Sequence, residues 1–393
     1  MTPAAPSGRT AGRVLALGLP GIPEVAAGDD LATLLVQALE LAEEPLLPGD
    51  VLVVSSKIVS KAGGLTVRAD DRAQAVDHQT VRVVAERTGP RGTTRIVHSR
   101  CGAVMAAAGV DTSNVAPGTV LLLPQDPDAL ARRLRADLHG LTGQRPGVVI
   151  SDTLGRPWRQ GQVDQAIGAA GMQVLDDLRG TTDPRGNRLE VTLRAVADEI
   201  ASLADLVKGK IDGVPAALVR GLAPFVTGTD GPGAAELLRA DSGDWFRWGH
   251  VEAVRAALGV PPGTGGVRAR PMDPGDAAQR LRRALEVARA GDRALAAGIE
   301  VRPAPPSAAD DAGSGTADAG AGTAVVVSCP SPDGPGAPAS PEGPVDLGAL
   351  VGLGRFCERV RVAGRSEDLE IDLEVLSGPP PRVFLRARPG REL

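Results

Sequence analysis

The amino-acid sequence predicts an α/β fold for residues 11–225, followed by an extension of different character. Short apolar runs such as 51–54 and 148–150 are typical of buried strands, because a strand covered on both faces needs no polar alternation. Between such runs, segments such as 29–43 carry apolar residues at helical spacing. Strands that alternate with helices in this way are typical of an α/β body.

The elements expected in this body follow from the same patterns, in chain order. The first strand, Arg13–Leu17, enters a turn at Gly18–Pro23, and Asp29 or Asp30 is the N-cap expected for the first helix. The second strand is Asp50–Val54. After it we expect a polar helix at Asp77–Thr88, strands at Arg95–His98 and Thr119–Leu123, a helix at Asp126–Leu141, the strand Val148–Ile150, helices or a strand–helix pair at Val163–Gly171 and Glu190–Val207, and a strand at Ala216–Arg220.

The rest of the chain divides into three parts. Residues 226–302 form a helical extension that includes an amphipathic helix at Asp276–Ala297. Residues 303–345 are a linker rich in Pro, Ala, Gly and Ser, with one isolated strand expected at Thr323–Ser328. Residues 346–393 regain an apolar pattern typical of a helix and a hairpin. We expect this whole extension to be weakly folded and to carry no catalytic residue.

Composition excludes several classes of function. The 393 residues carry a net charge of −5 and no basic tract, which argues against a nucleic-acid partner. No apolar run approaches the ~20 residues of a membrane span, and the N-terminus lacks the pattern of a signal peptide. The three cysteines are odd in number and widely separated, which suits a reducing cytoplasm. We therefore expect a cytoplasmic protein.

Two polar residues follow the strand at 148–150. Asp152 and Thr153 are expected where this strand leaves the sheet, and ligands collect beyond the carboxyl ends of strands in open α/β sheets. A carboxylate and a hydroxyl there suit a hard divalent cation. The alternative is that Asp152 caps the next helix. The common nucleotide-binding loop and the zinc and serine-hydrolase motifs are all absent from the sequence.

Further candidates follow other strands. Ser56 and Lys61 come after the strand at 50–54, and a lysine ammonium there can neutralise a phosphate. Only four of the 43 Lys and Arg residues are lysines, in two doublets, so a phosphate-binding role for Lys61 and an ordinary surface position both stay open. Asp111 and Asn114 either form an Asx turn or contact a cation and a ligand.

Other polar residues have ordinary structural interpretations. Asp126 and Asp128 are predicted to be helix caps, and Trp158 a lid or packing residue. Most of the charged residues on the helix that ends near Lys208, namely Asp198, Glu199 and Asp205, are predicted to be solvated.

Taken together, the sequence resembles the coenzyme F420-0:L-glutamate ligases, including the N-terminal half of their two-domain actinobacterial relatives. The resemblance runs in order over about residues 13–222. Its segments are Ile22–Val25, Gly28–Leu31, Asp50–Lys61, Ala106–Val115, Leu121–Asp128, Val149–Gln162, Gly168–Gly171, Asp183–Asn187, Ala195–Glu199, Asp205–Lys210 and Val219–Gly221.

The resemblance implies a mixed-sheet α/β ligase body and a reaction. Such an enzyme joins L-glutamate to the lactyl carboxylate of coenzyme F420-0 through an amide, consumes GTP, releases GDP and phosphate through an acyl phosphate, and then adds γ-linked glutamates. By the resemblance, the residues that contact the nucleotide are Ile22, Pro23, Glu24, Val25, Ser56, Lys61, Asn114, Lys208, Gly209 and Lys210. Asp111, Asp152 and Thr153 hold divalent metal, and Lys61 and Asp152 are the catalytic residues. The segment Lys208–Gly213 approaches either the nucleotide or a second metal.

The resemblance also implies cofactors and partners. Two Mg²⁺ or Mn²⁺ ions are expected, with K⁺ as a further candidate, and the family forms an intertwined homodimer. Two-domain relatives add a flavin-binding domain, but residues 226–393 show no pattern like it, so FMN is not expected. Two alternatives stay open: a metal-dependent GTP hydrolase or phosphatase, and a non-catalytic deazaflavin-binding protein. The number of glutamates added, the preferred metal, the lactyl or dehydro form of the precursor and the general base for the amine are not predicted.

Overall fold

The computed structural model describes residues 12–69, 72–240, 243–264, 267–304, 323–329, 347–376 and 381–390. The chain divides into two compact units. The first combines Met1–Val81 with Val97–Asp244, and the second combines Arg82–Ile96 with Trp245–Leu393. Residues 82–96, which lie inside the predicted α/β body, therefore belong to the second unit.

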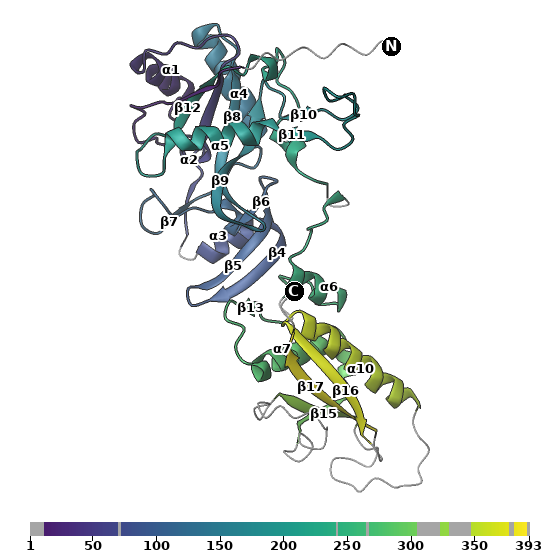
Figure 1. Ribbon diagram of the computed structural model, residues 1–393. Helices are drawn as coiled ribbons and strands as arrows, with labels where there is room; N and C mark the ends of the chain where they lie inside the picture. The colour runs from purple at the N-terminus through teal and green to yellow at the C-terminus, as the bar shows by residue number, and fades with distance from the viewer. Residues whose placement is uncertain are drawn as a thin grey trace. The chain divides into compact units, whose positions relative to one another are not determined.

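The first unit is built on a five-stranded mixed sheet in the strand order β1–β12–β2–β8–β9 (Figure 1). Its strands are β1 (Leu15–Gly18), β12 (Ala216–Arg220), β2 (Val51–Ser55), β8 (Gly147–Arg156) and β9 (Arg159–Ala170). The strands β2 and β8 run parallel, and the other neighbouring pairs of this sheet are antiparallel. The predicted fold class, an α/β body with a mixed sheet, is confirmed.

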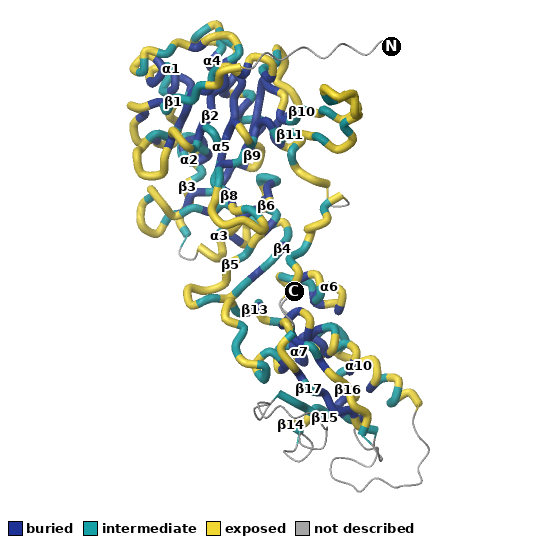
Figure 2. Tube along the Cα trace, in the orientation of Figure 1, coloured by how far each residue is buried: buried dark blue, intermediate teal, exposed yellow. Residues whose placement is uncertain are grey.

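Helices cover both faces of this sheet. They are α1 (Leu31–Leu41), α2 (Ser56–Ala62), α4 (Pro127–Thr142) and α5 (Val196–Lys208). Leu52 and Val54 pack in a core with α1, α2 and α4, whereas Val51 and Val53 pack in a second core with α5. All four side chains are fully buried, as the dark blue of β2 in Figure 2 shows. Burial on both faces explains why this strand is apolar throughout.

Side chains at the helix starts confirm some predictions and correct one. The Asp30 carboxylate caps α1 by accepting from the amide of Ala32 at 3.0 Å. Asp126 caps α4 in the same way. Asp128 is not a cap, because its buried carboxylate accepts hydrogen bonds from the amides of Ala169 and Ala234.

The predicted polar helix at Asp77–Thr88 is wrong. The helix α3 (Arg72–Gln79) ends early, and β4 (Thr80–Gly89) begins directly after it. Val83 and Val84 are buried, and β-branched side chains of this kind favour a strand once they pack against neighbours.

The structure also decides the two segments for which the sequence did not distinguish a helix from a strand. Residues 163–171 lie almost entirely in the strand β9, and residues 190–207 contain a strand–helix pair, β11 followed by α5. The remaining elements of the first unit are β3 (Thr66–Arg68), β6 (Val104–Ala106), η1 (Ala107–Gly109), β7 (Thr119–Leu121), β10 (Leu175–Asp177), β11 (Leu193–Ala195), η2 (Ala223–Phe225) and η3 (Ala234–Leu237).

The second unit has a hydrophobic core of its own, which corrects the expectation of a weakly folded extension. Besides β4, its elements are β5 (Gly92–Ser99), α6 (His250–Ala257), β13 (Arg270–Pro271), α7 (Ala277–Ala290), α8 (Arg293–Ala297), β14 (Glu300–Pro303), β15 (Ala324–Ser328), α10 (Leu347–Arg365), β16 (Leu369–Leu376) and β17 (Arg382–Pro389). A sheet in the order β14–β15–β17–β16 packs with α7 and α10.

The strand expected at Thr323–Ser328 forms, but it is not isolated. It is β15, and it pairs with β14 on one side and β17 on the other. The helix and hairpin expected over residues 346–393 are confirmed as α10, β16 and β17. Most of the predicted linker, residues 303–345, lies outside the described residues. Among the described residues, no helix combines the length and the apolar character needed to span a bilayer.

The second unit contains a network of ion pairs around one buried carboxylate. Glu367 is fully buried, and its two oxygens pair with Arg255 at 2.9 Å and with Arg283 at 2.8 Å. A third guanidinium, that of Arg270, lies 3.9 Å from the same carboxylate. Removing one member of such a network leaves buried charges without compensation.

We expect Glu367→Gln to lower the free energy of unfolding of the second unit by about 3–5 kcal/mol. Urea unfolding followed by circular dichroism measures the change. The matched control is Glu358→Gln on α10, whose half-exposed ion pair with Arg361 is expected to contribute little to stability. Equal, small effects of the two substitutions would show that the buried network does not stabilise this unit.

Candidate functional site

A pocket of about 370 Å³ lies in the first unit, where β2 and β8 end their parallel pairing. It brings together most of the predicted site residues. Those that line it are Ile22, Pro23, Glu24, Val25, Lys61, Asn114, Asp152, Thr153, Lys208, Gly209 and Lys210. Ser56 is buried behind this lining, and its hydroxyl donates to Asp152 at 3.1 Å.

The structure corrects the predicted position of Asp152 and Thr153. The pairing of β2 with β8 ends at Ser151, but β8 continues to Arg156 along β9. Asp152 and Thr153 therefore lie inside a strand, beyond the end of its parallel neighbour. The alternative in which Asp152 caps a helix is excluded by this position.

The Asp152 carboxyl is the most perturbed acid of the pocket. Burial, together with the nearby charges of Asp164 and Asp111, raises the pKa of Asp152 to about 6 against the hydrogen bond from Ser56. The negative charges of Asp164 and Asp111 repel that of Asp152. A cation among them would relieve this repulsion.

Asp111 is joined to the pocket by an ion pair with one of the lysines that line it. The ammonium of Lys57, which lines the pocket, lies 2.8 Å from the Asp111 carboxylate. Ser113 donates to the same carboxylate from its amide, at 2.8 Å, and from its hydroxyl. Burial acts to raise the pKa of Asp111, but these donors hold it below its usual value. Asp111 therefore makes the Asx-type contact and also lies near Asp152.

Lys61 is already paired inside the pocket. Its ammonium contacts the carboxylate of Glu24, with Lys61 largely buried and Glu24 80% exposed. An exposed carboxylate can move away when a more highly charged anion arrives. Lys57 and Lys61 are thus two ammonium groups in one pocket, each balanced by a single carboxylate in this structure.

Asp164 is the site residue that the sequence interpretation missed. It lies on β9 directly opposite Thr153, and its side chain is 4% exposed. Thr153 donates to one carboxylate oxygen at 2.7 Å, and Ser151 and Lys208 donate to the other at 2.8 and 2.7 Å. Burial acts to raise the pKa of Asp164, but the charge of Lys208 holds it below its usual value. The available signal was an acid two residues before the apolar run Ala166–Ala170.

The helix α5 also differs from its predicted solvated character. Lys208 is buried with Asp164, and Asp198 accepts a hydrogen bond from the amide of Ala166 at 2.9 Å. Asp205 is half-buried and lines the pocket, so only Glu199 among these acids is exposed as expected. Trp158, at the turn between β8 and β9, is 80% exposed.

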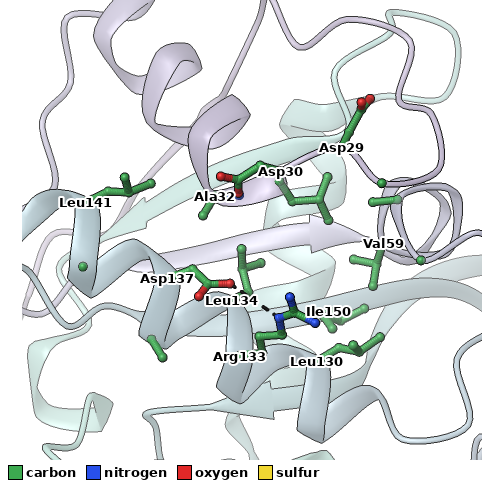
Figure 3. A pocket seen from close by; sticks show the side chains of 16 residues that line it. Asp29, Asp30, Ala32, Val59, Leu130, Arg133, Leu134, Asp137, Leu141 and Ile150 are labelled. Carbon is green, nitrogen blue, oxygen red and sulfur yellow. Dashed lines mark hydrogen bonds and ion pairs between the residues drawn. The ribbon is translucent and has the colours of Figure 1, made fainter.

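A larger cavity, of about 730 Å³, lies on the other side of α2, between α1 and α4 (Figure 3). Its floor is apolar and includes Val59, Leu134 and Ile150. Its polar residues are already engaged: Asp30 caps α1, and Arg133 pairs with Asp137. Because it has no cluster of lysines and free carboxylates, we do not place the chemistry there.

The donor set of the smaller pocket is made of hard oxygens. Asp152, Thr153 and Asp164 offer carboxylate and hydroxyl oxygens, which Mg²⁺ and Mn²⁺ prefer. Asp111, a predicted metal ligand, does not line the pocket itself and is joined to it by its ion pair with Lys57. Within the described ranges, no group of three or more His, Cys, Asp or Glu side chains is arranged to hold a metal by itself. Mg²⁺ is commonly held by one or two carboxylates together with substrate phosphates, so this pocket fits a cation that arrives with a phosphorylated substrate.

The family whose description is F420-0:gamma-glutamyl ligase matches residues 21–221. A Methanopyrus kandleri protein named coenzyme F420:L-glutamate ligase is 42% identical over 244 residues, which cover 57% of this chain and 94% of that protein. Proteins of the same name from Methanothermobacter thermautotrophicus and Halobacterium salinarum are 40% and 37% identical, and the matches cover 98% and 95% of their lengths. Every residue of the smaller pocket lies inside the range that the family matches. By this match over half its length, the chain belongs to the F420-0:gamma-glutamyl ligase family.

Proposed function

We propose that this ligase joins L-glutamate to coenzyme F420-0 in a reaction driven by GTP, and that the 370 Å³ pocket is its active site. Family membership supports the joining of glutamate to F420. The observation that carries the rest is the convergence of Lys57 and Lys61 with Asp111, Asp152 and Thr153 beside one pocket. Ammonium groups beside carboxylates suit a triphosphate bound together with a cation.

The pocket lining suggests how the nucleotide binds. The turn Ile22–Val25, with Ser56, Asn114 and the segment Lys208–Lys210, surrounds the place where we put GTP. Lys61 contacts the triphosphate once Glu24 has moved away. The phosphates carry more charge than one carboxylate, so they compete well for the Lys61 ammonium.

Asp111, Asp152 and Thr153 hold a divalent cation, Mg²⁺ or Mn²⁺, in this proposal. Their oxygens fit such an ion, and a bound cation would favour the charged form of Asp152, whose pKa burial raises to about 6. When bound, the cation neutralises charge that develops on the phosphates. The resemblance also predicts a second ion.

The chemistry has two steps. The carboxylate of F420-0 attacks the γ-phosphate of GTP, so that an acyl phosphate forms and GDP leaves. The glutamate amine then attacks the acyl carbon, phosphate leaves and the amine gives up a proton to form the amide. Lys61 brings two anionic reactants together and stabilises the transferring phosphoryl group, which is where positioned cations contribute most to phosphoryl transfer.

Measuring GDP release with Mn²⁺ present, with and without F420-0 and L-glutamate, tests the proposal. We expect rapid GDP formation only when F420-0 and L-glutamate are both present. Undiminished GTP turnover without them would instead identify a GTP hydrolase that uses the same pocket. Binding of F420-0 with no turnover in any mixture would identify a deazaflavin-binding protein.

The oligomeric state and the flavin remain predictions from the resemblance. We expect a cytoplasmic homodimer that purifies without FMN. Light scattering measures the mass of the particle in solution, and the visible absorption spectrum of the purified chain reports bound flavin. A monomeric mass or a flavin spectrum would contradict these predictions.

A further inference from the structure

The buried carboxylate of Asp164 fixes the direction of a hydroxyl group in the pocket of the first unit. Asp164 and Thr153 face each other in the neighbouring strands β9 and β8, and Thr153 donates its hydroxyl proton to one Asp164 oxygen at 2.7 Å. The Asp164 side chain is only 4% exposed, so water competes little for this hydrogen bond. The single proton of the Thr153 hydroxyl is therefore held toward Asp164.

The oxygen of the same hydroxyl already accepts from a positive group. The ammonium of Lys210 contacts the Thr153 hydroxyl oxygen, and an ammonium can only donate. A metal ion likewise binds a hydroxyl through a lone pair of the oxygen. Because the Lys210 side chain is 62% exposed, it can move away when a cation binds. The Thr153 hydroxyl is thus oriented as a cation ligand before any cation is present.

The other oxygen of Asp164 is engaged away from Thr153. It accepts hydrogen bonds from Ser151 at 2.8 Å and from Lys208 at 2.7 Å. The Lys208 side chain is as buried as that of Asp164, so its charge balances the carboxylate locally. A carboxylate that is neutralised in this way, with donors on both oxygens, is suited to orient a neighbouring ligand.

Further contacts keep this carboxylate from turning. The hydroxyl of Ser202, on α5, donates to the backbone carbonyl of Asp164 at 2.9 Å. Lys208, at the end of the same helix, also donates to the hydroxyl of Ser151 at 2.8 Å. The helix α5 and the strands β8 and β9 therefore hold Asp164 in place together.

We propose that Asp164 is a positioning residue, which holds the Thr153 hydroxyl with its oxygen toward the divalent cation. It acts through Thr153 and is not itself a ligand of the ion. The inference rests on the proposed function for the presence of the cation at Thr153.

Asp164→Asn should reverse the Thr153 hydroxyl. Lys208 and Ser151 still require an acceptor, so the asparagine oxygen stays with them and its amide nitrogen donates to Thr153. The Thr153 proton then turns toward the cation. We expect the dissociation constant for Mn²⁺ to rise about 10–100-fold, as is usual when the partner of a metal ligand is changed. Electron paramagnetic resonance of unbound Mn²⁺, with full-length protein and no nucleotide, measures this constant, because only the chain and water then hold the ion.

A double variant tests the link between the two residues. Thr153→Val should weaken Mn²⁺ binding to a similar extent, whereas Thr153→Ser keeps the hydroxyl and should bind within about threefold of wild type. Adding Asp164→Asn to Thr153→Val should cause no further loss, because Asp164 then has no hydroxyl to orient. The matched control is Asp198→Asn, a half-buried acid of α5 that accepts from the Ala166 amide, which should bind Mn²⁺ like the wild type.

A second variant covers the case in which Asp164→Asn does not fold. Asp164→Val combined with Lys208→Met leaves no buried charge unpaired and offers Thr153 no acceptor, so the same loss of Mn²⁺ affinity is expected.

Three results would overturn the inference: a wild type that binds no Mn²⁺, Asp164→Asn with unchanged affinity, or losses that multiply when Asp164→Asn and Thr153→Val are combined. The expected coupling in a protein that transfers no glutamate would uphold it and refute the proposed reaction.

Discussion

Asp152→Asn should lower ligase turnover by at least about 10³-fold while it makes the cation-free protein more stable. The loss of turnover follows because the substitution removes an anionic oxygen from the cation and with it the positioning of the phosphates. The gain in stability follows from the raised pKa of Asp152, about 6 in the folded protein against its ordinary value of 3.8. Burying the charged carboxylate opposes folding, and asparagine carries no such charge.

The size of this difference in stability between wild type and Asp152→Asn depends on pH. Below about pH 4 the carboxyl is protonated in the folded and the unfolded chain, so wild type and Asp152→Asn should differ little through this group. The relative stability of the wild type is then lost as the pH rises through about 6. Above that pH the variant should be more stable by up to about 3 kcal/mol, since one pKa unit corresponds to ~1.4 kcal/mol.

Thermal unfolding without divalent ions, at several pH values, measures this difference. Saturating Mn²⁺ with a GTP analogue should reverse it, because the ligands stabilise only a protein that binds them. The matched control is Asp137→Asn at an exposed position of α4 in the larger cavity, which should change stability by less than about 0.5 kcal/mol at every pH. A variant that is less stable than wild type at pH 8 without metal would contradict the electrostatic account of Asp152.

Lys61→Met should lower kcat/KM for GTP by about 10²–10³-fold, because it removes a positioned charge from the transferring phosphoryl group. Stability should change little, since the partner of Lys61 is the exposed Glu24. Steady-state kinetics with varied GTP measures the effect. Retention of wild-type kcat/KM would place the triphosphate elsewhere.

Glu24→Gln is the matched variant for Lys61. It removes the carboxylate that holds the Lys61 ammonium in the ligand-free pocket, so the ammonium is free before GTP arrives. We expect the KM for GTP to fall a few-fold, opposite in direction to the effect of Lys61→Met. A rise in KM would show that Glu24 contacts the substrate and does not merely compete with it.

The central sheet and much of its site were predictable because local patterns decide them. The apolar run 51–54 forms β2, and the polar residues after it, Ser56 and Lys61, lie at the pocket because the chain leaves the sheet there. Asp152 and Thr153 also line the pocket, but from inside β8, beyond the end of its parallel neighbour β2. In each case the distance along the chain from the buried strand to the polar residue is short.

Other features depend on contacts that local patterns do not contain. Asp164 matters because β9 pairs with β8 and places it opposite Thr153, and residues 163–171 alone did not decide between helix and strand. The strand β15 looked isolated because residues 304–323 separate it from β14, and α10 and β16 lie between it and β17 along the chain. The sequence analysis therefore missed that the second unit is folded, although its sheet and helices share a hydrophobic core.

One measurement tests the central claim most directly. Purified protein is incubated with F420-0, GTP, L-glutamate and Mn²⁺, and the deazaflavin product is analysed by mass spectrometry. The account predicts a product heavier by one or more glutamyl residues, formed in step with GDP by the wild type and absent with Asp152→Asn. Deazaflavin that keeps its original mass while GTP is consumed would contradict the assignment of this pocket to glutamate ligation.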